Sequence, residues 1–177
     1  MSASLHSYYV DRGTALGMTM PHIAKYHSGP FRIAVILADP GGKFTAGSGA
    51  EKTSEIGLRN PDPTAGFLLR TIQDVGIELS EYLPLNALAG YNLRNLKKNR
   101  EVSAGLNSDM IQKAGVKAVI LGGVIAQSAK RYLNLPHNFP VFQMPHPSAR
   151  GRGMATRQSI DAAKLIRTAF ENARSQP

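Results

Sequence analysis

Four short apolar segments stand out along the chain, and each ends at a turn or at polar residues. They are residues 31–38 (FRIAVILA), 81–91 (EYLPLNALAGY), 116–122 (VKAVILG) and 139–145 (FPVFQMP). Apolar runs of this length are typical of strands that are buried in a parallel sheet. Pro84 lies inside the second segment, and we expect it near the strand start or at a sheet edge because proline donates no backbone hydrogen bond.

The segments between these strands have the spacing of helices. In residues 62–76 (DPTAGFLLRTIQDVG) the apolar positions share one helical face, with Asp62 and Pro63 suited to the first turn and Gly76 to the end. Further helices are predicted at 101–114, 123–133 and 156–173. Alternating strands and helices predict an α/β fold, with three α/β/α layers around a central, mostly parallel four-stranded sheet.

The length of 177 residues and the hydrophobic content of 42% indicate a single domain with a substantial core. Residues 1–29 show no sustained period, so we expect an irregular N-terminal arm that packs on one domain of residues 30–177. No apolar run approaches the roughly 18 residues of a membrane span, and the first residues lack the apolar core of a signal peptide. We therefore expect a cytoplasmic monomer with no membrane partner.

Charge and cysteine content narrow the function classes. The chain carries 21 Lys and Arg against 12 Asp and Glu, a net charge of +9. This balance favours a polyanionic partner, because binding phosphates releases counterions, although a merely basic protein fits the charge equally well. The absence of cysteine excludes disulfides, thiolate zinc sites and iron–sulfur clusters. We expect neither a metal nor a cofactor.

Each predicted strand ends in residues that can bind or approach a ligand. The first runs into residues 39–42 (DPGG), the second contains Asn86, the third ends in residues 122–123 (GG) and the fourth in residues 146–148 (HPS). The carboxyl ends of parallel strands share one edge of the sheet, where such folds bind ligands. One carboxylate, one amide and one imidazole are therefore expected to meet there.

These motifs, in this order, resemble the uracil-DNA glycosylase superfamily. The segment LADPGGK (37–43) is similar to its first motif, a buried strand that ends in an acid-Pro or Asn-Pro turn. HPSAR (146–150) matches its last motif, a His-Pro-Ser that precedes a wedge residue, and PLNALAGY (84–91) resembles the strand with the uracil-reading Asn. Residues 47–77 are similar to a segment of a bacterial branch. The resemblance covers about residues 31–150.

The resemblance implies a monofunctional DNA glycosylase that hydrolyses the N-glycosidic bond of uracil or a related deaminated base. Cleavage builds positive charge on the sugar and negative charge on the leaving base. Asp39 would stabilise the sugar cation and position a water, and His146 would donate to a base oxygen. The Asn86 amide offers a donor and an acceptor, which suits the edge of uracil and disfavours that of cytosine.

Contacts with the base and with DNA are expected for further residues. Gly41 would lie beside the base, where another branch carries a tyrosine that excludes thymine, and Phe44 would stack on the base. Ser148 would hold a phosphate oxygen, and Arg150 would fill the gap left by the flipped nucleotide. Contacts with DNA are also predicted for Arg152 and, from their place at the same edge, for Gly122, Gly123, Arg94, Lys97, Lys98 and Arg100; the glycines fit helix–strand packing equally well, and the basic residues can form a solvated segment.

Simpler interpretations exist for each of these residues. Asp39 can open a turn, Asn86 can be a satisfied polar residue, and His146 can be fixed merely by its flanking prolines. The alternative function is a catalytically inactive member that binds DNA or a nucleobase. A nucleotide enzyme on a Rossmann-like sheet is disfavoured, because no G-x-G-x-x-G opens a helix after the first strand and no P-loop is present.

Overall fold

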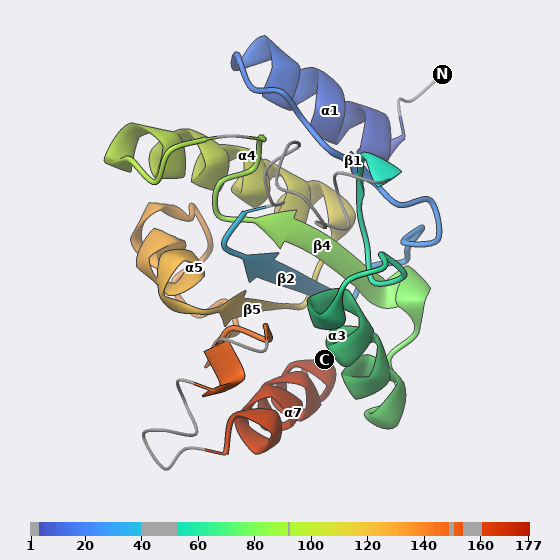
Figure 1. The fold of residues 1–177 in the computed structure, drawn as a ribbon. Helices are drawn as coiled ribbons and strands as arrows, with labels where there is room; N and C mark the ends of the chain where they lie inside the picture. The colour runs from blue at the N-terminus through green and yellow to red at the C-terminus, as the bar shows by residue number, and fades with distance from the viewer. Residues whose placement is uncertain (1–3, 40–52, 92, 149–150, 154–160) are drawn as a thin grey trace.

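The main sheet has four strands, and every neighbouring pair is parallel. The computed structural model describes residues 4–39, 53–91, 93–148, 151–153 and 161–177 (Figure 1). The strands are β2 (Ile33–Leu37), β4 (Tyr82–Asn86), β5 (Ala118–Gly122) and β6 (Val141–Met144), in the order β4-β2-β5-β6. This sheet confirms the predicted three-layer α/β/α architecture with a parallel four-stranded centre.

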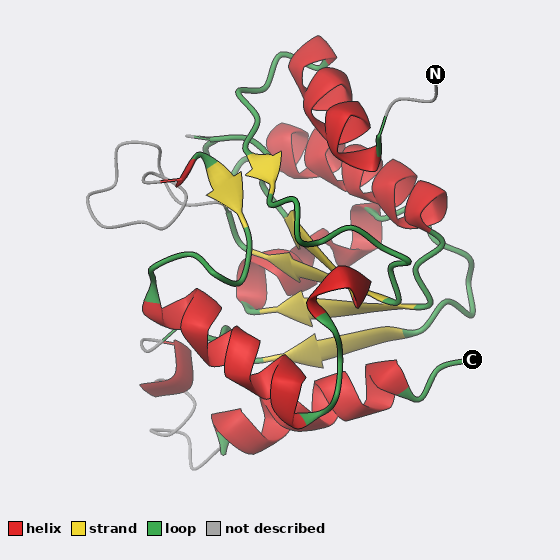
Figure 2. Cartoon of the chain, turned by 90° about the vertical axis from the view of Figure 1, so that its right-hand side faces the viewer, coloured by secondary structure: helices red, strands yellow, loops and turns green. Residues whose placement is uncertain are grey.

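Alternate residues of the strands feed two separate cores, as the two-residue period of a strand requires. One face packs against α3 (Pro63–Asp74) and α7 (Ala162–Arg174), and the other against α4 (Lys97–Ala114) and α5 (Val124–Ala129) (Figure 2). Two 3₁₀ turns, η1 (Leu79–Glu81) and η2 (Lys130–Tyr132), connect these elements.

Local sequence explains where two of these helices begin and end. The Asp62 carboxylate caps α3 by accepting from the Ala65 N–H at 2.8 Å, and Pro63 occupies the first helical position. Helix α4 ends at Gly115, whose φ of 64° lies in the left-handed region that glycine adopts readily. Both ends agree with the sequence prediction. The start of α4 does not, since it begins at Lys97 rather than at 101 and so includes part of the basic stretch.

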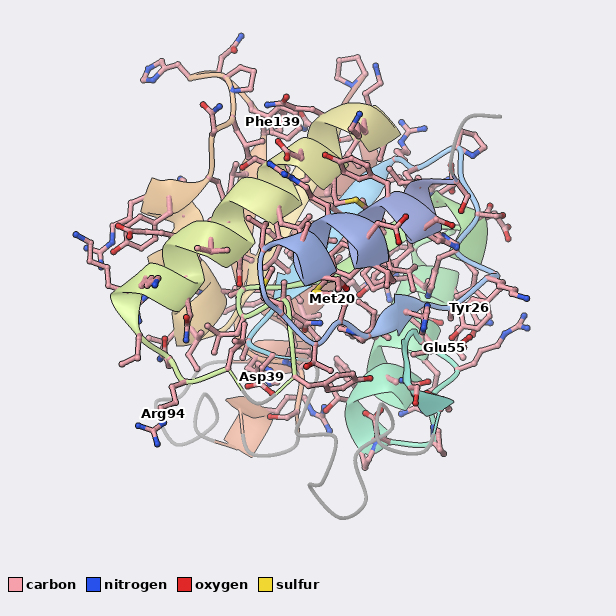
Figure 3. All side chains as sticks on the ribbon, turned by 90° about the horizontal axis from the view of Figure 1, so that it is seen from above. Met20, Tyr26, Asp39, Glu55, Arg94 and Phe139 are labelled. Carbon is pink, nitrogen blue, oxygen red and sulfur yellow. The ribbon has the colours of Figure 1, made fainter. Side chains whose placement is uncertain are left out.

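The prediction for the N-terminal residues was wrong in part. Residues 1–29 were expected to be irregular, but α1 (Leu5–Ala15) is a helix that lies beside α4 (Figure 3). Its pattern is weak because it buries only Tyr9 and Gly13. The chain then forms β1 (His22–Ile23), which pairs in parallel with β3 (Glu55–Ile56) in a second, two-stranded sheet.

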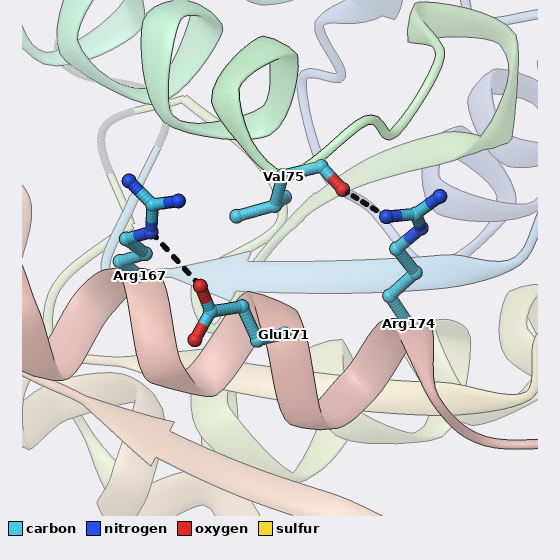
Figure 4. Close-up of polar contacts among 4 residues, drawn as sticks. All are labelled: Val75, Arg167, Glu171 and Arg174. Atoms are coloured by element: carbon cyan, nitrogen blue, oxygen red, sulfur yellow. Dashed lines mark hydrogen bonds and ion pairs between the residues drawn. The ribbon is translucent and has the colours of Figure 1, made fainter.

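Three further observations complete the fold. Pro84 lies in the middle of β4, which is an edge strand, so the expectation of an edge position is confirmed. Helix α7 is tied to the end of α3 by Arg174, whose guanidinium donates to the Val75 carbonyl at 2.7 Å (Figure 4). Across the part of the chain that the structure describes, no helix has the length and hydropathy needed to span a membrane.

Candidate functional site

Three of the predicted site residues line one cavity at the carboxyl edge of the main sheet. Asp39 follows β2, Asn86 ends β4 and His146 follows β6. The volume is about 340 Å³, within the range of roughly 300–1,000 Å³ that is typical of small-molecule sites. The cavity lies on the sheet face that α3 covers, and apolar residues form its floor: Val35, Leu58, Leu68, Tyr82 and Pro84.

Sheet topology explains why Asp39 and Asn86 meet. The chain runs from β2 to β4 on one side and then crosses back to β5 on the other side, so the strand order reverses at β2. Open α/β sheets bind ligands at such a reversal, beyond the carboxyl ends of the strands. Leu37 is registered opposite Asn86, which places Asp39 just two residues beyond that pair on the neighbouring strand.

His146 reaches this cavity across the end of β5. Strand β5 separates β6 from β2, and it ends in Gly122 and Gly123. A Cβ atom at Gly123 would lie 2.9 Å from the His146 Cβ, and one at Gly122 would lie 2.6 Å from Leu37 Cδ2. The missing side chains therefore make room for the histidine. Both glycines contact protein atoms, and their predicted contact with DNA stays a prediction.

Hydrogen bonding defines the donor and acceptor nitrogens of His146. The Ser148 N–H donates to Nδ1 at 3.2 Å, so Nδ1 is an acceptor and Nε2 carries the proton of the neutral ring. Burial lowers the pKa of His146 from its ordinary value of 6.5, and the nearby negative charge of Asp39 opposes this shift. At neutral pH the ring is therefore uncharged and has a single N–H donor at Nε2.

Asn86 offers the cavity a buried amide. The residue is 4% exposed, and its side chain has no hydrogen-bond partner among the residues that the structure describes. Its backbone carbonyl accepts from Asn107 Nδ2 at 2.9 Å. Buried polar groups are nearly always hydrogen-bonded, so an amide that faces a cavity without a partner is available to a ligand.

The opposite side of the cavity is formed by residues 55–64, here called the outer wall, which include β3 and the start of α3. Residues 22–27, here called the strap, hold this wall. The Ala24 N–H donates to the Ile56 carbonyl at 3.0 Å. In the other direction, the Leu58 N–H donates to His27 Nε2 at 3.4 Å. The wall thus depends on a segment some thirty residues earlier in the chain.

Tyr26 and His27 fasten the strap. The Tyr26 hydroxyl accepts from the Arg59 N–H at 2.8 Å, and the Arg59 guanidinium lies 4.9 Å from the ring centre. His27 is fully buried, and its Nδ1 donates to the Leu79 carbonyl at 2.8 Å while Nε2 accepts from the wall. Burial lowers the pKa of His27 to about 4, so the ring is neutral. Neither residue was predicted from the sequence to belong to the site.

The loop after His146 is closed by its own hydrogen bonds. Ser148 Oγ accepts from the Gly151 N–H at 3.1 Å, and the Ser148 carbonyl accepts from the Arg152 N–H at 2.9 Å. The Arg152 guanidinium donates to the Pro147 carbonyl and lies 4.3 Å from the Phe67 ring centre on α3. Arg152 thus ties the loop to the covering helix, and its predicted DNA contact, like that of Ser148, stays a prediction.

The remaining predicted residues fall into two groups. Arg94, Lys97 and Lys98 are exposed at and just before the start of α4, and Arg94 points away from the molecule (Figure 3). Arg100 is half-buried, and its Nη1 donates to Asn95 Oδ1 at 2.6 Å. Gly41, Phe44 and Arg150 lie outside the described residues.

Neither a metal site nor a known relative helps to assign the function of this cavity. Within the described ranges, no group of three or more His, Asp or Glu side chains is arranged to hold a metal ion. In comparisons with known proteins, no family model and no curated protein matches this chain. The resemblance to the uracil-DNA glycosylase superfamily therefore rests on the motifs quoted above alone.

Proposed function

We propose that this protein is a monofunctional DNA glycosylase that hydrolyses the N-glycosidic bond of uracil or a related deaminated base. The observation that carries the proposal is the single cavity that Asp39, Asn86 and His146 line together. These three groups come from separate strand ends, and each has a role in breaking this bond. The cytoplasmic location expected from the sequence belongs to the same proposal.

Recognition of the base is assigned to Asn86. A base inside a duplex is out of reach, so the nucleotide must flip out and enter the cavity. The Asn86 amide would then donate to one carbonyl of uracil and accept from its ring N–H, a pattern that cytosine reverses. The apolar floor excludes water from around this contact and thereby strengthens it.

Stabilisation of the leaving base is assigned to His146. As the bond between the base nitrogen and C1′ breaks, the electron pair moves to the base and negative charge grows on its carbonyl oxygens. The neutral His146 ring has its Nε2–H available as a donor, since Ser148 occupies Nδ1. A fixed donor in a half-buried site stabilises such a charge without reorganising.

Asp39 is assigned to the sugar. Its carboxylate is exposed at the edge of the cavity, where the deoxyribose of a flipped nucleotide would lie. A carboxylate there stabilises the oxocarbenium-like transition state and orients a water toward C1′. The water supplies the hydroxyl of the abasic sugar, and its second proton passes to the carboxylate and onward to the departed base.

DNA is the proposed partner. The net charge of +9 and the exposed Arg94, Lys97 and Lys98 at the start of α4 support an electrostatic contact with phosphates. These residues follow the carboxyl end of β4, so they lie near the same carboxyl edge of the sheet as the cavity, although α4 covers the opposite face. This shared edge supports the proposal that one ligand contacts both the basic residues and the cavity.

The decisive experiment incubates the protein with single- and double-stranded oligonucleotides that contain one uracil and then cleaves abasic sites with alkali. We expect strand scission at the uracil position and none in matched oligonucleotides with cytosine or thymine there. Selective binding of uracil-containing strands without scission would support the inactive, base-binding alternative. Neither scission nor selective binding would overturn the proposal.

A further inference from the structure

Two buried polar side chains of α4 hold the chain just beyond β4. Ser103 and Asn107 are at most 1% exposed and stand one turn apart on the same face of the helix. Asn107 Nδ2 donates to the Asn86 carbonyl at 2.9 Å, and the Ala89 N–H donates to Ser103 Oγ at 3.0 Å. Helix α4 therefore contacts both ends of the segment 86–89 through side chains.

The segment 86–89 depends on these contacts because β4 is an edge strand. On its inner side, the Ala87 and Leu88 N–H groups donate to the carbonyls of Leu37 and Ala38, at 2.8 and 2.9 Å. On its outer side no strand pairs with it in the part of the chain that the structure describes, and α4 supplies two hydrogen bonds there. The backbone that carries the Asn86 amide is thus held from two directions.

Asn107 holds the Asn86 carbonyl from a buried position, where an unpaired polar atom is unfavourable. Its Nδ2 contacts the Asn86 carbonyl, but its Oδ1 is buried and has no hydrogen-bond partner in the described part of the chain. An unsatisfied buried oxygen destabilises the folded state, and such exceptions in native structures point to a role other than stability. An apolar side chain of similar volume would pack here without that oxygen.

We propose that Asn107 is a positioning residue for base recognition, which holds the Asn86 backbone so that the Asn86 amide keeps its place in the cavity. This inference rests on the proposed function, in which Asn86 reads the base. Small displacements of a recognition or catalytic group have large effects on rate, because productive geometry is required when the bond breaks. Asn107 itself does not line the cavity and acts through Asn86.

The test compares Asn107→Leu with Ser108→Ala in the full-length protein. The leucine keeps the branched shape of Asn107, with a somewhat larger volume, but removes the donor to Asn86. Ser108 is a matched control, since it is 2% exposed on the same helix and bonds to Ala104 and Asn134 rather than to the segment 86–89. Each variant is assayed for excision of uracil and of cytosine, for oligonucleotide affinity, for its Tm and for the NMR signals of the Asn86 side-chain amide.

For Asn107→Leu we expect kcat/KM for uracil to fall roughly three- to tenfold, the range of one lost hydrogen bond. The preference for uracil over cytosine should fall, the Asn86 amide signals should shift, and oligonucleotide affinity should stay unchanged. Ser108→Ala should alter Tm alone. Asn107→Ala provides a second donor-free variant if the leucine does not fold.

Unchanged discrimination together with unshifted Asn86 signals, in either folded variant, would overturn the inference. Failure of the proposed function is a separate outcome, in which the wild-type protein neither excises nor binds uracil. The Asn86 amide signals decide the positioning role even then, because they report the place of the side chain without any catalysis.

Discussion

The two sides of the cavity are built in different ways. On the strand-end side, Asp39, Asn86 and His146 follow parallel strands whose backbones are fixed by the main sheet. The outer wall, residues 55–64, is held to the strap by a two-residue pairing, β1 with β3, and by backbone N–H groups that donate to Tyr26 and His27. The strand-end side holds the groups suited to chemistry, whereas the outer wall sets the shape of the space.

This difference predicts that substitutions on the two sides of the cavity have different effects. Substitutions of Asp39, Asn86 or His146 should change the reaction while leaving the fold intact, because sheet hydrogen bonds hold the backbone of the strands whatever these side chains are. Substitutions in the strap should change both the shape of the outer wall and the stability of the protein, because the same few side-chain hydrogen bonds contribute to both. The predictions below test that separation.

The largest effect is expected from Asp39→Asn on the strand-end side. We expect the single-turnover rate of uracil excision to fall at least ~10²-fold, the range typical of a positioned acid–base group. Oligonucleotide affinity and Tm should stay close to the wild-type values, because the carboxylate is exposed and lies beyond the end of β2. An unchanged single-turnover rate would remove Asp39 from the mechanism.

The strap should give the molecule an acid-sensitive stability. The pKa of His27 is about 4 in the folded protein against an ordinary 6.5, so the unfolded chain takes up this proton first as the pH falls. The stabilisation is complete above pH 6.5 and decreases down to about pH 4, by about 3 kcal/mol in total. The neighbours of the His27 ring are His6, Arg59, Tyr26 and Tyr82. All four remain when His27 is replaced, so the comparison isolates the His27 proton.

Urea unfolding at pH 7, 5.5 and 4 measures this dependence. The variant His27→Gln should unfold at a lower urea concentration at pH 7 and should lose less stability on acidification. His137→Gln, at an exposed position, serves as the control and should follow the wild-type curve. Parallel curves for the wild type and His27→Gln would mean that other groups cause the acid sensitivity.

Gly123→Ala tests whether the missing side chain at the end of β5 makes room for His146. At φ 85° and ψ 168° the backbone of Gly123 lies in a region that is essentially restricted to glycine, and the new Cβ would contact His146. We expect a loss of about 1–3 kcal/mol in the free energy of unfolding, together with reduced excision. Gly105→Ala, in open space on α4, should instead stabilise the protein by about 0.5–1 kcal/mol.

A smaller effect is expected from Tyr26→Phe in the strap. The change removes the oxygen that accepts from the Arg59 N–H while it keeps the ring beneath the guanidinium. We expect stability to fall by about 0.5–1 kcal/mol and uracil affinity to weaken more than kcat. Tyr132→Phe, whose ring also lies near an arginine but away from the wall, is the control. A selective loss of kcat would contradict a shape-setting role.

The smallest effect concerns the approach of DNA. Replacing Lys97 and Lys98 by alanine should flatten the slope of log K against log salt concentration by roughly 1–2 units. Lys97 forms only an exposed ion pair with Glu101 at 3.6 Å, so the folded state should lose little stability. The control pair is Lys113 and Lys117, which precede β5 at the other end of the strands. Equal slopes for both pairs would move the DNA path away from α4.

Much of the strand-end side could be predicted from the sequence, for a physical reason. Runs such as residues 33–37 are apolar on both faces, and parallel strands must align their carboxyl ends. Knowing the strands was therefore enough to bring Asp39, Asn86 and His146 together. The helix over residues 63–74 followed similarly from its cap and its one-sided apolar pattern.

The strap and the positioning residues could not be predicted in this way. Strands of two residues have no measurable period, and the bond between Leu58 and His27 joins positions 31 residues apart. Ser103 and Asn107 are polar residues on the buried face of α4. A pattern of apolar and polar positions assigns such residues to the exposed face. These features depend on isolated tertiary hydrogen bonds, and such bonds leave no repeating pattern in the sequence.

The strap also ties the N-terminal residues to a part of the molecule that is made later. During synthesis residues 22–27 leave the ribosome first, yet their partners in the outer wall follow some thirty residues afterwards, and the strands that flank the cavity later still. The pocket can therefore be completed only after the residues that follow β6 have been synthesised. A protein shortened to residues 30–177 would still contain the four strands and all three groups at their ends, but its outer wall would lack the hydrogen-bonding partners that the strap supplies.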